Sequence, residues 1–306
     1  MPDGLRSGYD ESRNDTDRMS RSSRPAAPVR NLIIISDTHS GCRVSLVHPD
    51  GAFLDGGGRY TPSDFQQKMW AWWREFWDVW VPEVTRGEPF DLVHNGDALD
   101  GVHHGSTTQI SHNMEDQQRI AEAVLGPVVR QCRASGGVYY HIRGTEAHVG
   151  QSGEYEERLA RSLGAKPNAE GQYARFDLWK RVGSKKGPLV HLLHHIGTTS
   201  SAAHESSAVN AELTASYVEA ARWGREPPDF IVRSHRHRSI AVDMNSAKGY
   251  AAAIVTPAWQ GKTPYVFKVP GARISEPQVG GVLIRDGDEE FYYRRWVKSF
   301  DRSKEE

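Results

Sequence analysis

Short apolar runs alternate with amphipathic stretches through the first two thirds of the chain. The run NLIIIS at 31–36 is rich in β-branched residues and bounded by polar ones, which is typical of a strand buried on both faces. Residues 63–84 carry Phe, Met and Trp at three- and four-residue steps after Ser63, which predicts an N-capped helix packed through its aromatic face. The same criteria predict strands at 90–97, 137–144, 172–179 and 188–195, and helices at 115–134, 153–164 and 205–224.

Strand patterns dominate the last third of the chain. We expect strands at 229–234, 239–244, 251–255 and 265–269, followed by a hairpin at 280–297 that turns at Asp286-Gly287. Alternating helices and strands followed by a run of strands predict an α/β fold, a sandwich of mixed sheets flanked by helices. No repeat or linker divides residues 29–306, so we expect a single domain there.

The first 28 residues differ from the rest of the chain. They are rich in Ser, Arg, Asp and Pro and contain few large apolar side chains. Such a composition buries too little apolar surface to offset the entropy of ordering. Residues 1–28 are therefore predicted to form a disordered leader, and they contain no apolar core for a secretory signal.

The bulk composition narrows the class of protein. Of the 306 residues, 38% are hydrophobic and 25% charged, as in globular proteins. A formal net charge of −1 argues against a generally cationic surface for nucleic acid. Cys42 and Cys132 are too few for a disulfide framework or a thiolate zinc cluster. Because no apolar stretch is long enough to span a bilayer, we expect a cytoplasmic protein without a membrane partner.

Acidic and histidine residues follow five of the predicted strands at their carboxyl ends. In an open α/β sheet these ends meet at one edge, where ligands bind. Carboxylates and imidazoles gathered there are the ligands of a divalent-metal site, and so many of them suit two ions rather than one. The candidates are Asp37, His39, Asp97, Glu146, His148, His194, His195, His235 and His237.

The motifs run in the order D-x-H, G-D, G-T-E-A-H, H-H and H-R-H, each after a predicted strand. This order resembles that of the calcineurin-like metallophosphoesterase superfamily. The resemblance implies an α/β/β/α sandwich with a dinuclear metal site at the carboxyl ends of the strands. It further implies that Asp37, His39 and His237 hold the first ion. Asp97 would bridge both ions, and His235 would bind the second.

Two positions depart from that pattern or leave it open. Either His194 or His195 would complete the second ion's ligands. The superfamily's third motif usually reads G-N-H followed by an acid, whereas this chain reads GTEAH at 144–148 and is a variant of it. Glu146 or Thr145 would then replace the usual Asn ligand. His148 would take the place of the histidine that donates a proton.

The resemblance implies an enzyme, a metal-dependent phosphoric ester hydrolase. It would hydrolyse phosphomonoesters or phosphodiesters through a hydroxide that bridges two divalent ions, while His148 protonates the leaving group. Mixed carboxylate and imidazole ligands suit Mn²⁺, with Fe, Zn or Ni as alternatives. The substrate would be a small molecule or a nucleic acid, so a metal-dependent nuclease is one alternative. The other is a catalytically impaired scaffold or partner-binding protein that keeps the fold.

Overall fold

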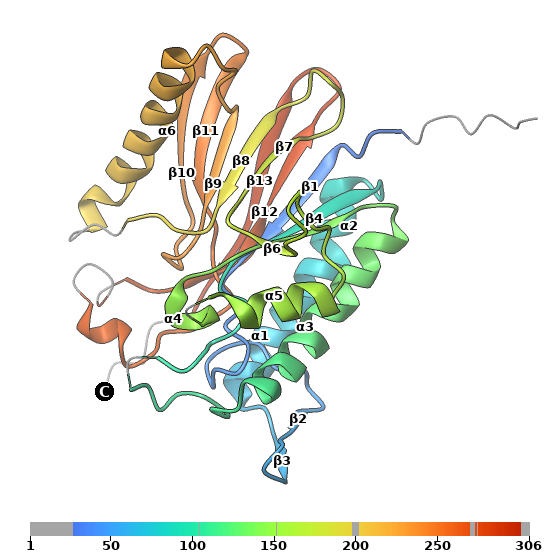
Figure 1. Cartoon of the computed structure of the whole chain (residues 1–306), viewed down its shortest axis with the longest axis vertical. Helices are drawn as coiled ribbons and strands as arrows, with labels where there is room; N and C mark the ends of the chain where they lie inside the picture. Colours follow the sequence, from blue (N-terminus) through green and yellow to red (C-terminus); the bar gives the residue numbers. More distant parts are fainter. Residues whose placement is uncertain are drawn as a thin grey trace, which may run out of the picture.

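Two large mixed sheets lie face to face between helices (Figure 1). The structure is a computed structural model that describes residues 27–103, 105–150, 152–197, 202–269, 273 and 275–300. All but the last two residues of the leader predicted at 1–28 lie outside the described residues. Helices cover the outer face of each sheet, and apolar side chains fill the space between the sheets. The predicted α/β fold with two mixed sheets is confirmed.

The first sheet has six strands in the order β13-β12-β1-β4-β5-β6. β1, β4, β5 and β6 are parallel, whereas β12 and β13 run antiparallel to their neighbours. Because Ile35 lies opposite His94 and Asn95 lies opposite Ile142, the parallel strands end at one edge. The strands span β1 Asn31–Ile35, β4 Phe90–Asn95, β5 Tyr139–Ile142, β6 Ala174–Arg175, β12 Gln278–Asp286 and β13 Phe291–Ser299.

The second sheet has five strands in the order β10-β11-β9-β8-β7. Its central strands β8, β9 and β11 are parallel, and the edge strands β7 and β10 are antiparallel to them. Its strands span β7 Asp177–Arg181, β8 Leu189–Leu193, β9 Phe230–Arg233, β10 Ile240–Ser246 and β11 Gly249–Val255. Helix α6, Glu205–Arg222, packs on its outer face through Val209 and Leu213.

Aromatic side chains anchor the helical layer on the first sheet. Ser63 caps α1 as predicted, accepting a hydrogen bond from the Gln66 amide. α1, Asp64–Glu75, continues through a π-helical turn at Phe76–Trp80 into α2, Val81–Thr85. Trp73 and Phe76 are buried against Trp259. The helix tryptophans that contact this cluster are therefore packing residues. α3, Met114–Ala134, and α5, Glu154–Ser162, complete the layer.

Several local predictions differ from the structure. The strand predicted at 265–269 is a 3₁₀ turn at Val266–Lys268. The strand predicted at 172–179 divides into β6 and β7, which belong to different sheets. The sequence pattern also missed a small hairpin, β2 Ala52–Phe53 with β3 Arg59–Tyr60, and the one-turn helix α4, Glu146–Val149.

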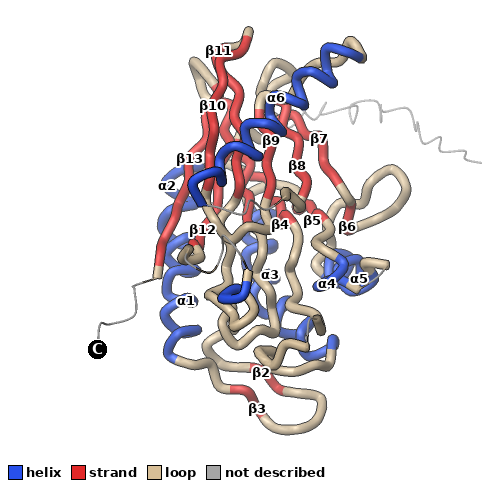
Figure 2. The backbone as a smooth tube through the Cα atoms, turned by 90° about the vertical axis from the view of Figure 1, so that its left-hand side faces the viewer, coloured by secondary structure: helices blue, strands red, loops and turns tan. Residues whose placement is uncertain are grey.

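Loops gather beyond the carboxyl ends of the parallel strands. Figure 2 shows them filling the space below both sheets, between α1 and α4. Among the described residues, none of the helices has the length and apolarity to cross a membrane. The architecture thus places the ends of both sheets over one group of loops.

Replacing Trp73 with Ala tests the aromatic anchor. The indole is buried and contacts the rings of Trp77 and Trp259 edge to face. We expect the free energy of unfolding to fall by about 3–5 kcal/mol, because the change leaves a large cavity. Urea unfolding of Trp73→Ala measures it. Trp223→Ala, at an indole that is 69% exposed, is the matched control and should change stability little.

Candidate metal centre

Backbone hydrogen bonds hold the loops after the strands side by side. The Asp37 and His39 amides donate to the carbonyls of Gly96 and Asp97, at 2.9 and 3.0 Å. In the second sheet, the Ser234 amide donates to the His194 carbonyl at 2.8 Å. The loop after β1 therefore follows the loop after β4, and the loop after β9 follows the loop after β8.

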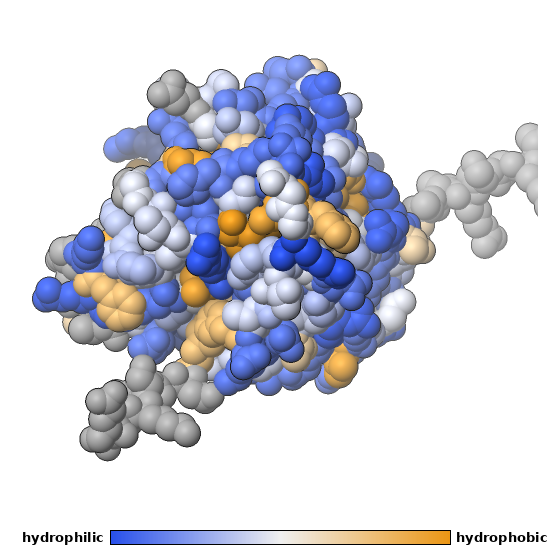
Figure 3. All heavy atoms as spheres, turned by 90° about the horizontal axis from the view of Figure 1, so that it is seen from below, coloured by the Kyte–Doolittle hydropathy of each residue, from blue (hydrophilic) through white to orange (hydrophobic). Residues whose placement is uncertain are grey.

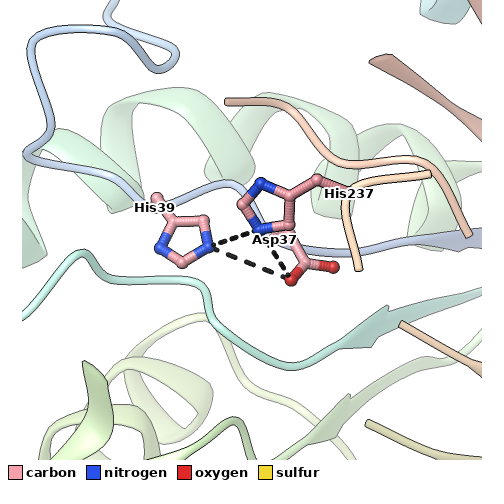
Figure 4. A group of neighbouring side chains, drawn as sticks. All are labelled: Asp37, His39 and His237. Carbon is pink, nitrogen blue, oxygen red and sulfur yellow. Dashed lines mark hydrogen bonds and ion pairs between the residues drawn. The ribbon is translucent and has the colours of Figure 1, made fainter. Parts of the chain in front are cut away.

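Asp37, His39 and His237 form the first group of side chains that could hold a metal ion (Figure 4). The Nε2 atoms of the two histidines are 3.1 Å apart. Asp37 Oδ1 lies 3.3 Å from His237 Nε2 and 3.9 Å from His39 Nε2. Three potential ligand atoms from opposite ends of the sequence thus face one small volume.

Asp97, His194 and His235 form the second group. Asp97 Oδ2 lies 3.0 Å from His194 Nε2 and 3.8 Å from His235 Nδ1. His194 Nδ1 donates to the carbonyl of Asn95 at 2.6 Å, which leaves Nε2 as the nitrogen available to a ligand. The structure thus brings His194 to the group, whereas His195 is exposed and lies outside the described groups.

The two groups are neighbours. The His235 amide donates to Asp37 Oδ2 at 3.3 Å, so the carboxylate of a first-group residue contacts the backbone of a second-group residue. Among the described residues, the carboxylate of Asp97 belongs to the second group alone. Its role as a bridge between two ions stays a prediction.

Unusual backbone conformations concentrate in these groups. Six described residues other than glycine have positive φ, and Arg86, which ends α2, is the only one of them outside the groups. A non-glycine residue in this region costs of order 1–3 kcal/mol and persists where the surrounding structure enforces it. Such strain is typical of functional sites. The other five are Asp37 at 50°, His39 at 39°, Asp97 at 54°, His235 at 71° and His237 at 53°.

Two glycines allow the close approach of these loops. A Cβ on Gly96 would lie 2.4 Å from His194 Nδ1, and a Cβ on Gly144 would lie 2.1 Å from Asp97 Oδ1. Neither separation is possible between non-bonded atoms. The glycine of the G-D motif therefore lets the His194 ring lie against the loop after β4, and the glycine of the GTEAH motif lets its own loop lie against Asp97.

A third group adjoins the first and contains His39, Asp100 and His148. The His39 ring lies edge to face with the His148 ring, and His39 Nδ1 is 3.6 Å from Asp100 Oδ1. His148 Nδ1 donates to the Asp100 carbonyl at 2.5 Å, so a neutral ring carries its lone pair on Nε2. Gln109 and Gln260 donate to the two Asp100 oxygens, which fixes that carboxylate.

The GTEAH motif places Thr145, rather than Glu146, against Asp97. The Thr145 amide donates to Asp97 Oδ1 at 2.7 Å, and its hydroxyl lies 3.2 Å from the same oxygen. Glu146 begins α4, is exposed, and is in none of the described groups. The described geometry therefore gives no support to Glu146 as a ligand, and that assignment stays a prediction.

Carboxylates and imidazoles in the site shift each other's pKa values. Burial raises the pKa of Asp97, but the imidazoles of His194 and His148 outweigh it and hold that pKa well below its usual range. Burial lowers the pKa of His194, but the Asp97 carboxylate outweighs it and raises the pKa to about 10. Burial lowers the pKa of His148 to about 4. The Asp97 carboxylate thus favours positive charge on His194, whereas burial keeps His148 neutral.

The donor set fits divalent cations. It combines two buried carboxylates with four imidazoles, a mixture that Mn²⁺, Fe, Zn and Ni accept. Asp37 Oδ1 and His39 Nδ1 are buried, and neither has a hydrogen-bond partner of good geometry among the described residues. A buried polar atom without a partner is costly, and a cation bound by Asp37 would satisfy its oxygen.

A chain of buried hydroxyls joins the two sheets directly beneath the groups. Thr256 Oγ1 lies 2.7 Å from both Ser36 Oγ and Ser234 Oγ, and Asn95 Nδ2 donates to Ser234 Oγ at 2.6 Å. Ser36 and Ser234 immediately precede Asp37 and His235. The network therefore fixes the points at which both loops leave their strands.

Glu156 of α5 supports the Asp97 loop and was missed by the sequence interpretation. One carboxylate oxygen accepts the Ala98 amide at 2.7 Å, and the other accepts the Gly144 amide at 2.5 Å. His141 Nε2 lies 3.6 Å away, and the His141 ring stacks on His94. Glu156 is fully buried, and an acid on the apolar side of a predicted helix was the available signal.

No protein-family model matches the chain, and no curated protein matches it. Among solved structures, it is similar to vacuolar protein sorting 29 of Cryptosporidium parvum, with 11% identity, 89% of this chain and 100% of that chain covered, and a TM-score of 0.33.

Two further structures show similarly distant likenesses. Protein TM1076 of Thermotoga maritima is 12% identical, with 89% of this chain and 100% of that chain covered and a TM-score of 0.32. The sulfate thiohydrolase SoxB of Thermus thermophilus, in complex with glycerol, is 13% identical, with 90% and 57% covered and a TM-score of 0.38. At such scores, the conclusions below depend on the chain's own geometry.

Glu156→Gln tests the support of the Asp97 loop. The amide group of Gln places an N–H against one backbone N–H, so one buried donor loses its acceptor. We expect the free energy of unfolding to fall by about 1–3 kcal/mol. Urea unfolding measures the change. Glu154→Gln, on an exposed residue of the same helix, is the control, and equal stability of the two variants would contradict the supporting role.

Proposed function

We propose that this chain is a metal-dependent phosphoesterase with a dinuclear centre of the calcineurin-like type. The observation that carries the proposal is a pair of adjacent Asp/His groups. Five of their six residues have strained backbone conformations, and these five come from three loops. Backbone strain of this kind needs a reason other than stability. Two adjacent sets of oxygen and nitrogen ligands provide one, because they suit a pair of divalent ions.

Each group would hold one ion. Asp37, His39 and His237 would bind the first, with Asp97 as the expected bridge to the second. The second ion would be bound by Asp97, His194 and His235. We expect Mn²⁺, since mixed carboxylate and imidazole ligands accept it. Two bound divalent ions would supply Lewis acidity and neutralise the charge of a phosphoryl group.

The chain's own groups orient these ligands and move protons. Thr145 fixes Oδ1 of Asp97 through its amide and leaves Oδ2 directed at His194 and His235. The Asn95 carbonyl orients His194, and the Asp100 carbonyl orients His148. With Nδ1 of His148 committed to that carbonyl, Nε2 is the atom that would take up a proton and deliver it to the leaving oxygen.

A small phosphoester is favoured over a nucleic acid as substrate. Arg236 and Arg238 flank the site histidines, but both are engaged within the chain. Arg236 donates to the carbonyls of Gly197 and Glu205, and Arg238 pairs with the Glu205 carboxylate at 3.0 Å. Seen from below the sheets in Figure 3, apolar patches interrupt a mostly hydrophilic surface. With both arginines engaged within the chain, neither is free to follow a nucleic-acid backbone.

Asp97→Ala tests the centre. Loss of this carboxylate removes a ligand from the second group, so hydrolysis of an aryl phosphoester should be abolished and bound divalent metal should decrease. Metal analysis and a chromogenic ester assay measure both effects. Glu154→Gln, at an exposed carboxylate outside the described groups, is the matched control and should retain the wild-type metal content. Full activity in Asp97→Ala would refute the proposal.

His148→Ala tests the proton donor. We expect alkyl esters, whose leaving oxygens need a proton, to lose about 10²–10⁴-fold in turnover. Aryl esters with acidic leaving groups should lose far less. An equal loss for both kinds of ester would contradict this role.

If the wild-type chain bound no ion in manganese-supplemented buffer, the scaffold alternative would replace the enzyme.

A further inference from the structure

Strand β7 is the free edge of the second sheet. It pairs with β8 on one side, and no strand among the described residues pairs with its other side. The Val182 amide donates to the Pro188 carbonyl, so the backbone groups of Val182 point toward the β8 side. Hydrogen-bonded and free pairs alternate along an antiparallel ladder. The amides and carbonyls of Asp177, Trp179 and Arg181 therefore face away from the sheet.

The same three residues carry side chains on the outer face. The intervening Leu178 is buried between the sheets, and successive side chains of a strand point to opposite faces. Helix α6 covers β10 and β11 and leaves the outer face of β7 uncovered (Figure 2). Trp179 is 51% exposed, and its ring stacks on His191 with 4.1 Å between centroids. The edge is thus aromatic at its centre.

The edge is complementary to a second copy of itself. A two-fold axis at Trp179 would place Trp179 opposite its own copy and Asp177 opposite Arg181 of the other chain. The axis generates the Asp177/Arg181 pair twice, so there are three pairs in all. In each pair both residues would have a free amide and a free carbonyl, as an antiparallel hydrogen-bonded ladder requires. Opposite charges across strands stabilise such pairs. Arg181 also contacts Glu226 of its own chain, which holds its guanidinium beside this edge.

Features that normally protect an edge strand are neutralised here. Lys180 points inward, a device that blocks pairing when its charge is free. Its ammonium, however, forms an ion pair with Asp91 of the first sheet at 2.6 Å and lies over the Tyr140 ring. The charge is therefore satisfied within the chain, and it does not oppose the approach of another strand.

We propose that two copies of this chain associate through antiparallel pairing of β7 with β7, which joins their second sheets into one. Such a dimer is isologous: each copy contributes the same surface. The proposal is independent of the metal centre, since it depends only on the edge strand and its outward side chains.

Cross-linking tests the register. Trp179→Cys removes the indole and weakens the dimer, but it places each thiol opposite its own copy, so a short bifunctional thiol reagent, which traps each encounter irreversibly, should link the full-length chains in high yield at high chain concentration. Asp177→Cys alone should not link, because the two copies of residue 177 would be about 13 Å apart along the strands. The native Cys42 and Cys132 are buried. Linking of Asp177→Cys as efficient as that of Trp179→Cys would overturn the proposed register.

Sedimentation of the full-length chain over a range of concentrations tests the association itself. We expect a monomer–dimer equilibrium whose dissociation constant rises tenfold or more in Trp179→Ala and in Asp177→Lys, which faces Arg181 of the other copy with a like charge. Phe53→Ala, at an exposed residue of the β2–β3 hairpin at the opposite end of the molecule from β7 (Figure 1), should dimerise as the wild type does. The proposal would be overturned if the wild-type chain stayed monomeric at all concentrations. That result would stand against it even if the chain's own first 26 residues were what covered the edge.

Discussion

The structure depends on holding two buried carboxylates, Asp37 and Asp97, beside one another against their mutual repulsion. Backbone hydrogen bonds between the loops after β1 and β4 bring the two carboxylates close together. Each carboxylate faces imidazoles from the second sheet. Removing carboxylates from water is unfavourable unless opposite charge is near. The raised pKa of His194 shows how strongly Asp97 attracts that charge. A divalent cation in each group would meet the same need.

The sandwich serves this arrangement by joining two sheets at one end. Ser36 and Asn95 lie at the ends of strands in the first sheet, and Ser234 and Thr256 lie at the ends of strands in the second. Their side chains meet in one buried hydrogen-bond network. Movement of either sheet would break hydrogen bonds that have no water to replace them. The strained residues above the network are thus supported from both sides.

Much of the fold was predictable, because apolar runs and helical periodicity depend on local sequence. The strand-end Asp and His residues were predictable for a related reason, since the parallel strands bring their carboxyl ends to one edge. The strand predicted at 265–269 failed because a short apolar run does not by itself distinguish a strand from a turn. The contacts of Glu156 and Thr145 with the Asp97 loop depend on tertiary packing, which local patterns do not encode.

The most direct measurement is the location of metal in crystals grown with manganese, by anomalous diffraction. The account predicts two peaks, one within coordination distance of Asp37, His39 and His237, the other within that distance of Asp97, His194 and His235. A single peak among His39, Asp100 and His148, or no peak near either carboxylate, would contradict it.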